Sequence, residues 1–207
     1  WATFVIYDMT EKKQLSEKSI RHDGKELIHI PEQNTMYFLN TGVSPTDIIY
    51  TKWDDSLEIT YRDSPYHGDY KFWSYIERFG NQSKLITGGG DIFNVEDYSF
   101  THEANIFEST SHVLENVIFD ADYFYAVVSS GNNSLYESDK KIWIEKRAVS
   151  NPKVVIATPE EMKDIRANNL SFVDGKVFLL ANSTEAIKKP SYEIYCYTFD
   201  KNLSQID

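Results

Sequence analysis

The sequence FDADYFYAV at residues 119–127, followed after a polar loop by KIWIEKR at residues 141–147, decides the fold. An aromatic residue leads into a turn rich in aspartate, then into an apolar strand, a polar loop and an aromatic strand. Aromatic and β-branched residues suit a pleated, half-buried surface, and aspartate is typical of turns. The stretch therefore predicts β-strands connected by turns rather than helices.

The same order of features recurs on both sides of this stretch. WDDSLEITY, from residue 53, leads to KFWSYIER, and FVDGKVFLL, from residue 172, leads to YEIYCY. Short β-type runs bounded by Asp, Asn, Gly, Ser or Pro also occur along the rest of the chain. We therefore expect blade-like units near residues 53–87, 119–156 and 172–200.

These repeats resemble the β-propeller group in general. They match no named family within it, because the chain has no WD pair, kelch double glycine or sialidase-type Asp box. The resemblance implies four-stranded antiparallel blades, each stable only when stacked beside its neighbours. We predict an all-β fold with propeller-like repeats of antiparallel strands, in a single domain over residues 1–207 or as a fragment of a larger propeller. A β-sandwich is the alternative.

One short connector helix is also predicted. Thr158 is a capping residue, Pro159 takes the first helical position, and Glu161, three residues after the cap, completes a capping box. The helix would continue to the pair Asn168-Asn169, where amide side chains favour a turn. An element this short would connect strands rather than cover a sheet.

The charge of the chain limits its partners. Its 207 residues include 32 acidic and 21 basic side chains, which give a formal net charge of −11. That charge repels phosphate backbones and anionic headgroups, so we expect no nucleic-acid partner. A basic ligand, a cation or a neutral sugar is compatible with it, and the partner is expected to be a protein or a glycan.

The expected cellular compartment follows from the acidity of the chain and its scarcity of cysteine. No apolar run approaches the roughly 18 residues of a spanning helix, so no membrane span is expected. The single cysteine, Cys196, can form no internal disulfide. Acidity and cysteine scarcity together lead us to expect a secreted or extracytoplasmic protein. Glycosylation would require a eukaryotic secretory route, and the sequons begin at Asn81, Asn132, Asn169, Asn182 and Asn202.

The segment YRDSPYHGDY at residues 61–70 is the predicted ligand-binding loop. Aromatic faces beside carboxylates suit sugar rings or cationic groups, and the histidine adds a titratable donor or acceptor. The alternative is a hairpin loop whose tyrosines lie on neighbouring strands. The residues predicted to bind a ligand are Asp63, Tyr66, His67, Asp69 and Tyr70.

A second acidic loop follows a run of glycines at residues 88–90. Asp91, Asn94, Glu96 and Asp97 could supply hard oxygen ligands to calcium, the one cofactor considered. The spacing is not that of an EF-hand, because His102 stands where the last glutamate would be. A flexible acidic turn is the alternative.

No catalytic residue is predicted, because the chain has no Gly-x-Ser-x-Gly elbow and no metal-ligand spacing of histidines. The leading hypothesis is an exported, non-catalytic recognition or sensor module that binds a protein or glycan through its loops. One alternative is a propeller-type glycoside hydrolase, or the propeller domain of a peptidase, with carboxylates drawn from Asp54, Asp63, Asp69 and Glu77. Another is a structural scaffold subunit.

Overall fold

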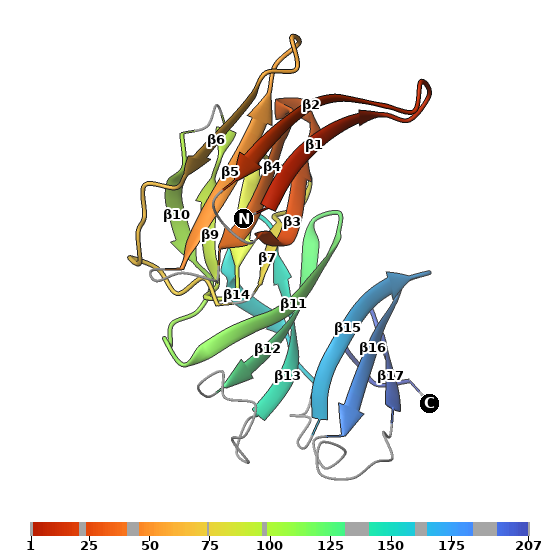
Figure 1. The fold of residues 1–207 in the computed structure, drawn as a ribbon. Coiled ribbons are helices and arrows are strands. Elements are labelled where there is room, and N and C mark those ends of the chain that lie inside the picture. Colours follow the sequence, from red (N-terminus) through yellow and green to blue (C-terminus); the bar gives the residue numbers. More distant parts are fainter. Residues whose placement is uncertain are drawn as a thin grey trace. The chain divides into compact units, whose positions relative to one another are not determined.

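The protein is all-β. The computed structural model describes residues 2–20, 24–40, 46–73, 75–96, 99–130, 141–159, 165–183 and 194–206. Within these ranges, antiparallel strands form several sheets of two to four strands, and the helical element is a single 3-10 turn, η1 (Pro31–Gln33) (Figure 1). The predicted fold class is confirmed. No closed sheet is found in the described part of the chain.

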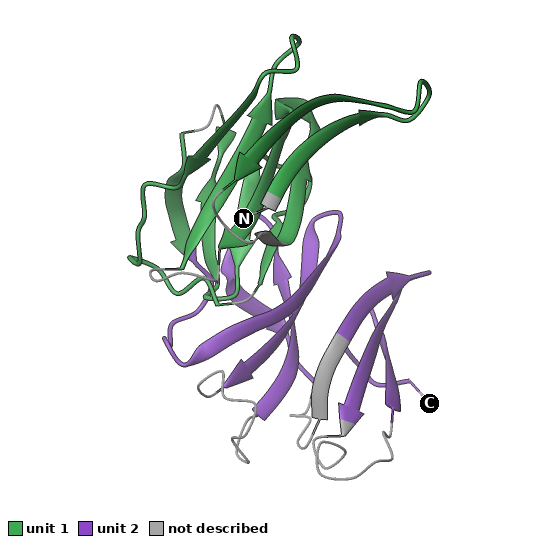
Figure 2. Ribbon diagram, viewed as in Figure 1, with its two compact units in different colours: residues 1–104 green, residues 105–207 purple. Residues whose placement is uncertain are grey.

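The chain divides into two compact units, residues 1–104 and residues 105–207 (Figure 2). A compact unit is not by itself a domain, so the single domain over residues 1–207 stays a prediction. No described helix is long and apolar enough to cross a membrane.

Unit 1 contains a two-stranded sheet and two four-stranded sheets. In both larger sheets, strands that are consecutive in the sequence are neighbours, as expected for a meander of hairpins. The strands are β1 (Ala2–Asp8) and β2 (Lys13–Ile20); β3 (Gly24–Ile30), β4 (Thr35–Asn40), β5 (Asp47–Trp53) and β6 (Ile59–Asp63); and β7 (Ile76–Arg78), β8 (Lys84–Thr87), β9 (Asp91–Asn94) and β10 (Thr101–Asn105).

Unit 2 contains a four-stranded and a three-stranded sheet with the same sequential order. The strands are β11 (His112–Asp120), β12 (Tyr123–Ser130), β13 (Lys141–Ala148) and β14 (Asn151–Ala157), followed by β15 (Ile165–Val173), β16 (Lys176–Ser183) and β17 (Ile194–Asp200).

Two of the expected repeat units coincide with sheets, and one does not. The described residues between 119 and 156 lie in the sheet β11–β14, and those between 172 and 200 lie in the sheet β15–β17. Residues 53–87 instead cover the end of β5, all of β6 and the start of the next sheet, so this unit is a correction. Its turn after Trp53 joins the third and fourth strands of a sheet, and a hairpin turn has the same composition wherever it lies in a meander.

The predicted connector helix is wrong in its second half. Ile165, Arg166 and the pair Asn168-Asn169 belong to strand β15, which pairs with β16. The helical start at residues 160–164 lies outside the described residues. Pairing with β16 overrides the local capping signal here, because helix propensity is weak and contacts with other parts of the fold can outweigh it.

Alternation along the strands produces the cores. In β4, Tyr37 and Leu39 join one buried cluster with Tyr50 and Phe93, whereas Phe38 points the other way, towards Ile20 and Ile49. The principal cluster of unit 2 contains Tyr125, Val127, Ile144, Val177 and Leu179.

Candidate functional site

The candidate site is the loop of residues 64–75 that connects β6 to β7, called here the β6–β7 loop. It holds four of the five residues predicted to bind a ligand, and Asp63, the fifth, ends β6. The loop is anchored at its start, where the Ser64 amide donates to the Ile48 carbonyl at 2.8 Å. The site is therefore built on the strand ends of the sheet β3–β6.

A buried aspartate holds the histidine of this loop. Asp47, the first residue of β5, places Oδ2 at 2.8 Å from His67 Nδ1, and the side-chain exposures are 7% for Asp47 and 59% for His67. The Ser64 hydroxyl donates to Asp47 Oδ1, and the Ile48 amide donates to the same oxygen at 2.7 Å. Because a carboxylate accepts, Nδ1 carries the proton of this contact, and Nε2 lies on the other side of the ring.

The buried environment of Asp47 disfavours the ionised form of its carboxyl group. Burial raises the pKa of this carboxyl above its ordinary value, against the opposing effects of Ser64, the Ile48 amide and His67. The raised pKa shows that burial outweighs the contacts that favour the ionised form. Such a carboxyl beside an imidazole is an arrangement able to orient the ring and to exchange protons with it.

Tyr66 and Tyr70 in the loop pack against a cluster of aromatic residues. The rings of Tyr66 and Tyr70 meet edge to face at 5.0 Å, and both contact Phe93. His102 stacks on Tyr70 at 4.6 Å, and its amide donates to the Tyr66 hydroxyl at 3.2 Å. Asp91 Oδ1 lies 2.9 Å from His102 Nε2. His102, which is paired with Asp91, therefore contacts both Tyr66 and Tyr70 and helps to hold them in place.

The tyrosines are partly structural, although they lie in a loop between two sheets and not on neighbouring strands of a hairpin. They pack against the core of unit 1 on one side, and burial raises the pKa of the Tyr70 phenol, with further contributions from Tyr66, Asp91 and Asp69. Asp63 and Asp69 are exposed. Tyr66 and Tyr70 are thus in contact, His67 is held separately by Asp47, and the role of all five residues in ligand binding stays a prediction.

Gly88 and Gly89 allow two segments of the backbone to pack closely. The Gly88 amide donates to the carbonyls of Phe72 and Tyr75 at 3.1 and 2.8 Å. A Cβ at Gly89 would lie 2.1 Å from the Lys71 carbonyl oxygen, and one at Gly88 would lie 2.9 Å from that of Phe72. The missing side chains let the end of the β6–β7 loop approach the β8–β9 turn.

The predicted calcium ligands are not gathered into a cluster in the described residues. Asp91 is directed to His102, and Asn94 Oδ1 accepts from the Glu96 amide at 2.8 Å, which closes a local turn. Asp97 lies outside the described residues. Across the described ranges, no group of three or more His, Cys, Asp or Glu residues could hold a metal ion. The calcium site stays a prediction.

An open groove of about 530 Å³ lies at the other end of β5. Asp54 faces it, but its carboxylate accepts hydrogen bonds from the amides of Ser56 and Glu58, both at 3.0 Å, and from the Ser56 hydroxyl at 2.7 Å. The Ser56 hydroxyl is the main cause of the lowered pKa of Asp54. The groove is lined by Glu32, Gln33, Asn34, Lys52, Trp53, Asp54, Asp55, Glu58 and Thr60.

Glu77, another of the hydrolase carboxylates, also has a local role. Its Oε1 accepts from the Arg78 amide at 2.7 Å, and burial raises its pKa. Arg78 in turn pairs with Glu32 at the groove. Asp54 and Glu77 therefore shape a turn and a strand end.

Sequence reasoning missed Asp47 and assigned Asp91 and His102 no structural partner. Asp47 lies 20 positions from His67 and in no motif, and its one local signal is its place before a buried strand. Asp91 and His102 lie on two neighbouring strands, β9 and β10. Both pairs can be recognised only when the positions of β5, β9 and β10 in the fold are known.

Comparison with known proteins shows the fold. No family model matches the sequence, and no curated protein matches it. Two solved structures are similar: hydrazine synthase from Kuenenia stuttgartiensis, with a TM-score of 0.60 and 8% identity over 98% of this chain, and an endo-arabinase from Bacteroides thetaiotaomicron VPI-5482, with a TM-score of 0.52 and 14% identity over 91%. The chain spans 58% of the hydrazine synthase chain and 82% of the endo-arabinase chain. Both are propeller-type folds, which supports the resemblance to the β-propeller group.

Proposed function

We propose that the chain is a recognition module that binds a neutral glycan through the β6–β7 loop. The observation that carries the proposal is the exposed His67 imidazole, held at 2.8 Å by the buried Asp47. A ring fixed in this way offers a directed hydrogen bond without losing side-chain entropy on binding. The exposed carboxylates of Asp63 and Asp69 add acceptors for hydroxyl groups in the same segment.

The polarity of the site favours a glycan over a protein. Protein interfaces depend on exposed aromatic or apolar anchors at their centre. Across the described part of residues 46–104, no large hydrophobic side chain is exposed. The loop and the end of β6 expose the His67 imidazole, the carboxylates of Asp63 and Asp69, and the ammonium of Lys71. These are polar groups that can bind the hydroxyls of a sugar.

The charge of the chain favours a neutral ligand. A net charge of −11 repels acidic glycans, and the exposed aspartates of the loop add to that repulsion. Binding without hydrolysis is the simpler function, because two of the four carboxylates considered for a glycosidase, Asp54 and Glu77, are engaged in local hydrogen bonds.

A panel of neutral pentose and hexose oligosaccharides, titrated by calorimetry, tests the proposal. His67→Ala should weaken binding about tenfold, the value of one well-made hydrogen bond. Asp69→Ala should also weaken it. Asp55→Ala is the matched control, because this exposed aspartate lies in the groove at the far end of β5.

Two outcomes would overturn the proposal. Equal affinities of the wild type and the His67→Ala variant would remove the loop from the binding site. Release of reducing ends from the panel by the wild type would make the chain a glycoside hydrolase instead.

The module is further proposed to work outside the cytoplasm, on the basis of its acidity and its single cysteine. Fractionation of cells that express the full natural gene tests this. Recovery of the protein in the cytoplasmic fraction alone would contradict it.

A further inference from the structure

We propose that the contact between Asp47 and His67 is an acid-released latch on the β6–β7 loop: when the Asp47 carboxylate takes up a proton, the His67 ring leaves it and residues 67–69 become mobile. The inference concerns the regulation of the candidate site, so its relevance to a ligand rests on the proposed function. The latch itself is a property of the chain without any ligand.

The two oxygens of Asp47 have different partners. Oδ1 accepts from the Ser64 hydroxyl and from the Ile48 amide, the latter at 2.7 Å, whereas Oδ2 lies 2.8 Å from His67 Nδ1. Because Oδ1 already accepts two hydrogen bonds, an added proton is placed on Oδ2. In acid an imidazolium carries a proton on each ring nitrogen, so two donors then face each other and no hydrogen bond joins them. Ser64 and Ile48 still hold the neutral carboxyl.

The exposure of the two side chains decides which one moves. The Asp47 side chain is 7% exposed and the His67 side chain is 59% exposed. A neutral carboxyl stays buried at a much lower cost than a carboxylate, and a charged ring at the surface is solvated by water. Protonation of Asp47 therefore releases His67 into solvent and leaves β5 in place.

The charges around Asp47 set the direction of the pH dependence. His67 is the ionisable group whose charge acts on the Asp47 carboxyl among the described residues. Strand β4 places the uncharged Asn40 opposite Asp47, and Asp63, at the end of β6, is exposed and pairs with Ile49. Burial raises the pKa of Asp47 above 3.8, so the latch opens at a higher pH than an ordinary aspartate would allow. It is closed above the folded-state pKa and open below it.

The released segment is short because both of its ends are fixed. The rings of Tyr66 and Tyr70 pack against Phe93, with centroids 5.7 and 5.1 Å away. Between them, Gly68 adopts a φ of +87°, and its amide donates to the Tyr66 carbonyl at 3.1 Å. Glycine tolerates this conformation and its alternatives equally well. Movement is therefore confined to residues 67–69, which carry two of the predicted ligand-binding side chains.

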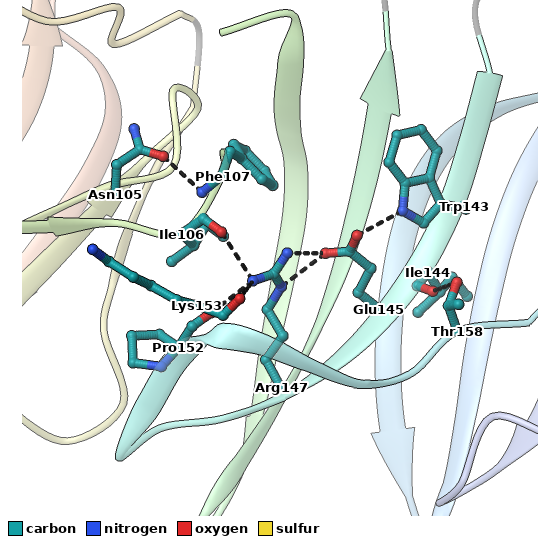
Figure 3. A network of polar contacts seen from close by, with 10 residues as sticks. All are labelled: Asn105, Ile106, Phe107, Trp143, Ile144, Glu145, Arg147, Pro152, Lys153 and Thr158. Carbon is teal, nitrogen blue, oxygen red and sulfur yellow. Dashed lines mark hydrogen bonds and ion pairs between the residues drawn. The ribbon is translucent and has the colours of Figure 1, made fainter. Parts of the chain in front are cut away.

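Other buried carboxylates have more enclosed partners. Glu145 is 8% exposed and its partner Arg147 is 4% exposed, and Arg147 Nη1 also donates to backbone carbonyls at 2.7 to 3.1 Å (Figure 3). His102, the partner of Asp91, is 27% exposed and stacks on Tyr70. Neither partner can turn into water without breaking further contacts, so both pairs are fixed, unlike the latch.

NMR of the chain without a ligand tests the latch. As the pH falls, the backbone order parameters of residues 67–69 should drop from about 0.85, the value of a rigid backbone, to below about 0.6. Those of Ser64 and Tyr70 should stay high. The carboxyl carbon of Asp47 should titrate with the same midpoint, because its protonation is the cause of the movement.

Variants assign the midpoint to its residues. Asp47→Asn does not titrate, so the order parameters of the loop should no longer depend on pH. Ser64→Ala should move the midpoint to a higher pH, because the Ser64 hydrogen bond favours the ionised carboxyl. Asp55→Asn is the matched control, since this exposed aspartate lies at the groove and should leave the midpoint unchanged. If thermal melting shows that Asp47→Asn does not fold, Ser64→Ala carries the test.

Three results would overturn the latch. They are constant order parameters in the wild type down to the onset of acid unfolding, an unchanged midpoint in Asp47→Asn or Ser64→Ala, and a loss of order that spreads to Ser64 and Tyr70 at the same midpoint. None of these measurements uses a ligand, so they are independent of the proposed function. Equal oligosaccharide affinity in the wild type and His67→Ala would remove the binding site and leave the latch intact.

Discussion

Asp47 and His67 are 20 positions apart in the sequence, yet the Asp47 Oδ2 atom lies 2.8 Å from the His67 Nδ1 atom. The contact joins the first residue of a buried strand to the most exposed ring of the β6–β7 loop. The contact orients the His67 ring, so the loop presents a hydrogen-bonding group in a defined direction. Burial raises the pKa of the Asp47 carboxyl in this contact.

The raised pKa of Asp47 predicts how stability changes with pH. Because the folded-state pKa lies above the ordinary value of 3.8, the fold binds this proton more tightly than the unfolded chain does. The contribution is present below 3.8 and is lost as the pH rises through the folded-state pKa. The free energy of unfolding of the wild type, relative to Asp47→Asn, should therefore fall as the pH rises through that window in urea titrations. A difference that rises instead would mean that the contacts with Ser64 and His67 outweigh burial.

The close approach at Gly89 predicts a large cost for a single methyl group. A Cβ would lie 2.1 Å from the Lys71 carbonyl oxygen, so Gly89→Ala must displace the backbone of the β6–β7 loop. We expect a loss of about 2 to 3 kcal/mol in chemical denaturation. Gly175→Ala is the matched control. There the φ of +74° is strained for alanine but nothing lies within 4 Å, so about 1 kcal/mol is expected. Equal losses would contradict the packing role of the glycine run.

The buried pair of Glu145 and Arg147 predicts non-additive mutations. Arg147→Met leaves the carboxylate buried without its partner, and we expect a loss of about 3 to 5 kcal/mol in unfolding free energy. The double variant Arg147→Met with Glu145→Leu should recover most of that loss, because no buried charge remains. A double-mutant cycle measured by denaturation checks this, and simple additivity of the two losses would contradict it.

The Tyr125 phenol is expected to lose its proton at a higher pH than an ordinary tyrosine does. Burial, together with Asp120, Asp200 and Tyr123, raises the pKa of Tyr125 to about 12, and its hydroxyl donates to the Lys201 carbonyl at 3.0 Å. The associated stability is present below pH 10 and is lost as the pH rises towards about 12. Tyr125→Phe should remove one high-pH step from the ultraviolet phenol titration. A titration curve identical to that of the wild type would show that another tyrosine is responsible.

Local sequence patterns predicted the parts of the fold that depend on neighbours in the chain. The turn of residues 121–122 connects two strands as FDADYFYAV indicates, because aspartate turns and aromatic strands are local preferences. The helix predicted from Thr158 failed over residues 165–169 because pairing with β16 replaced a local cap. The unit at residues 53–87 was misplaced because a turn does not show which strands of a sheet it joins.

The sequence by itself determined the all-β class, the net negative charge and the approximate strands, and it predicted the loop of residues 61–70 as the place for a site. Only the tertiary structure decided which side chains meet there. Asp47 reaches His67, Asp91 reaches His102, and Gly89 meets Lys71, each between segments well separated in the chain. Composition and periodicity report which face of a strand is buried, whereas contacts between strand ends depend on how several strands pair, and that pairing leaves no local signal.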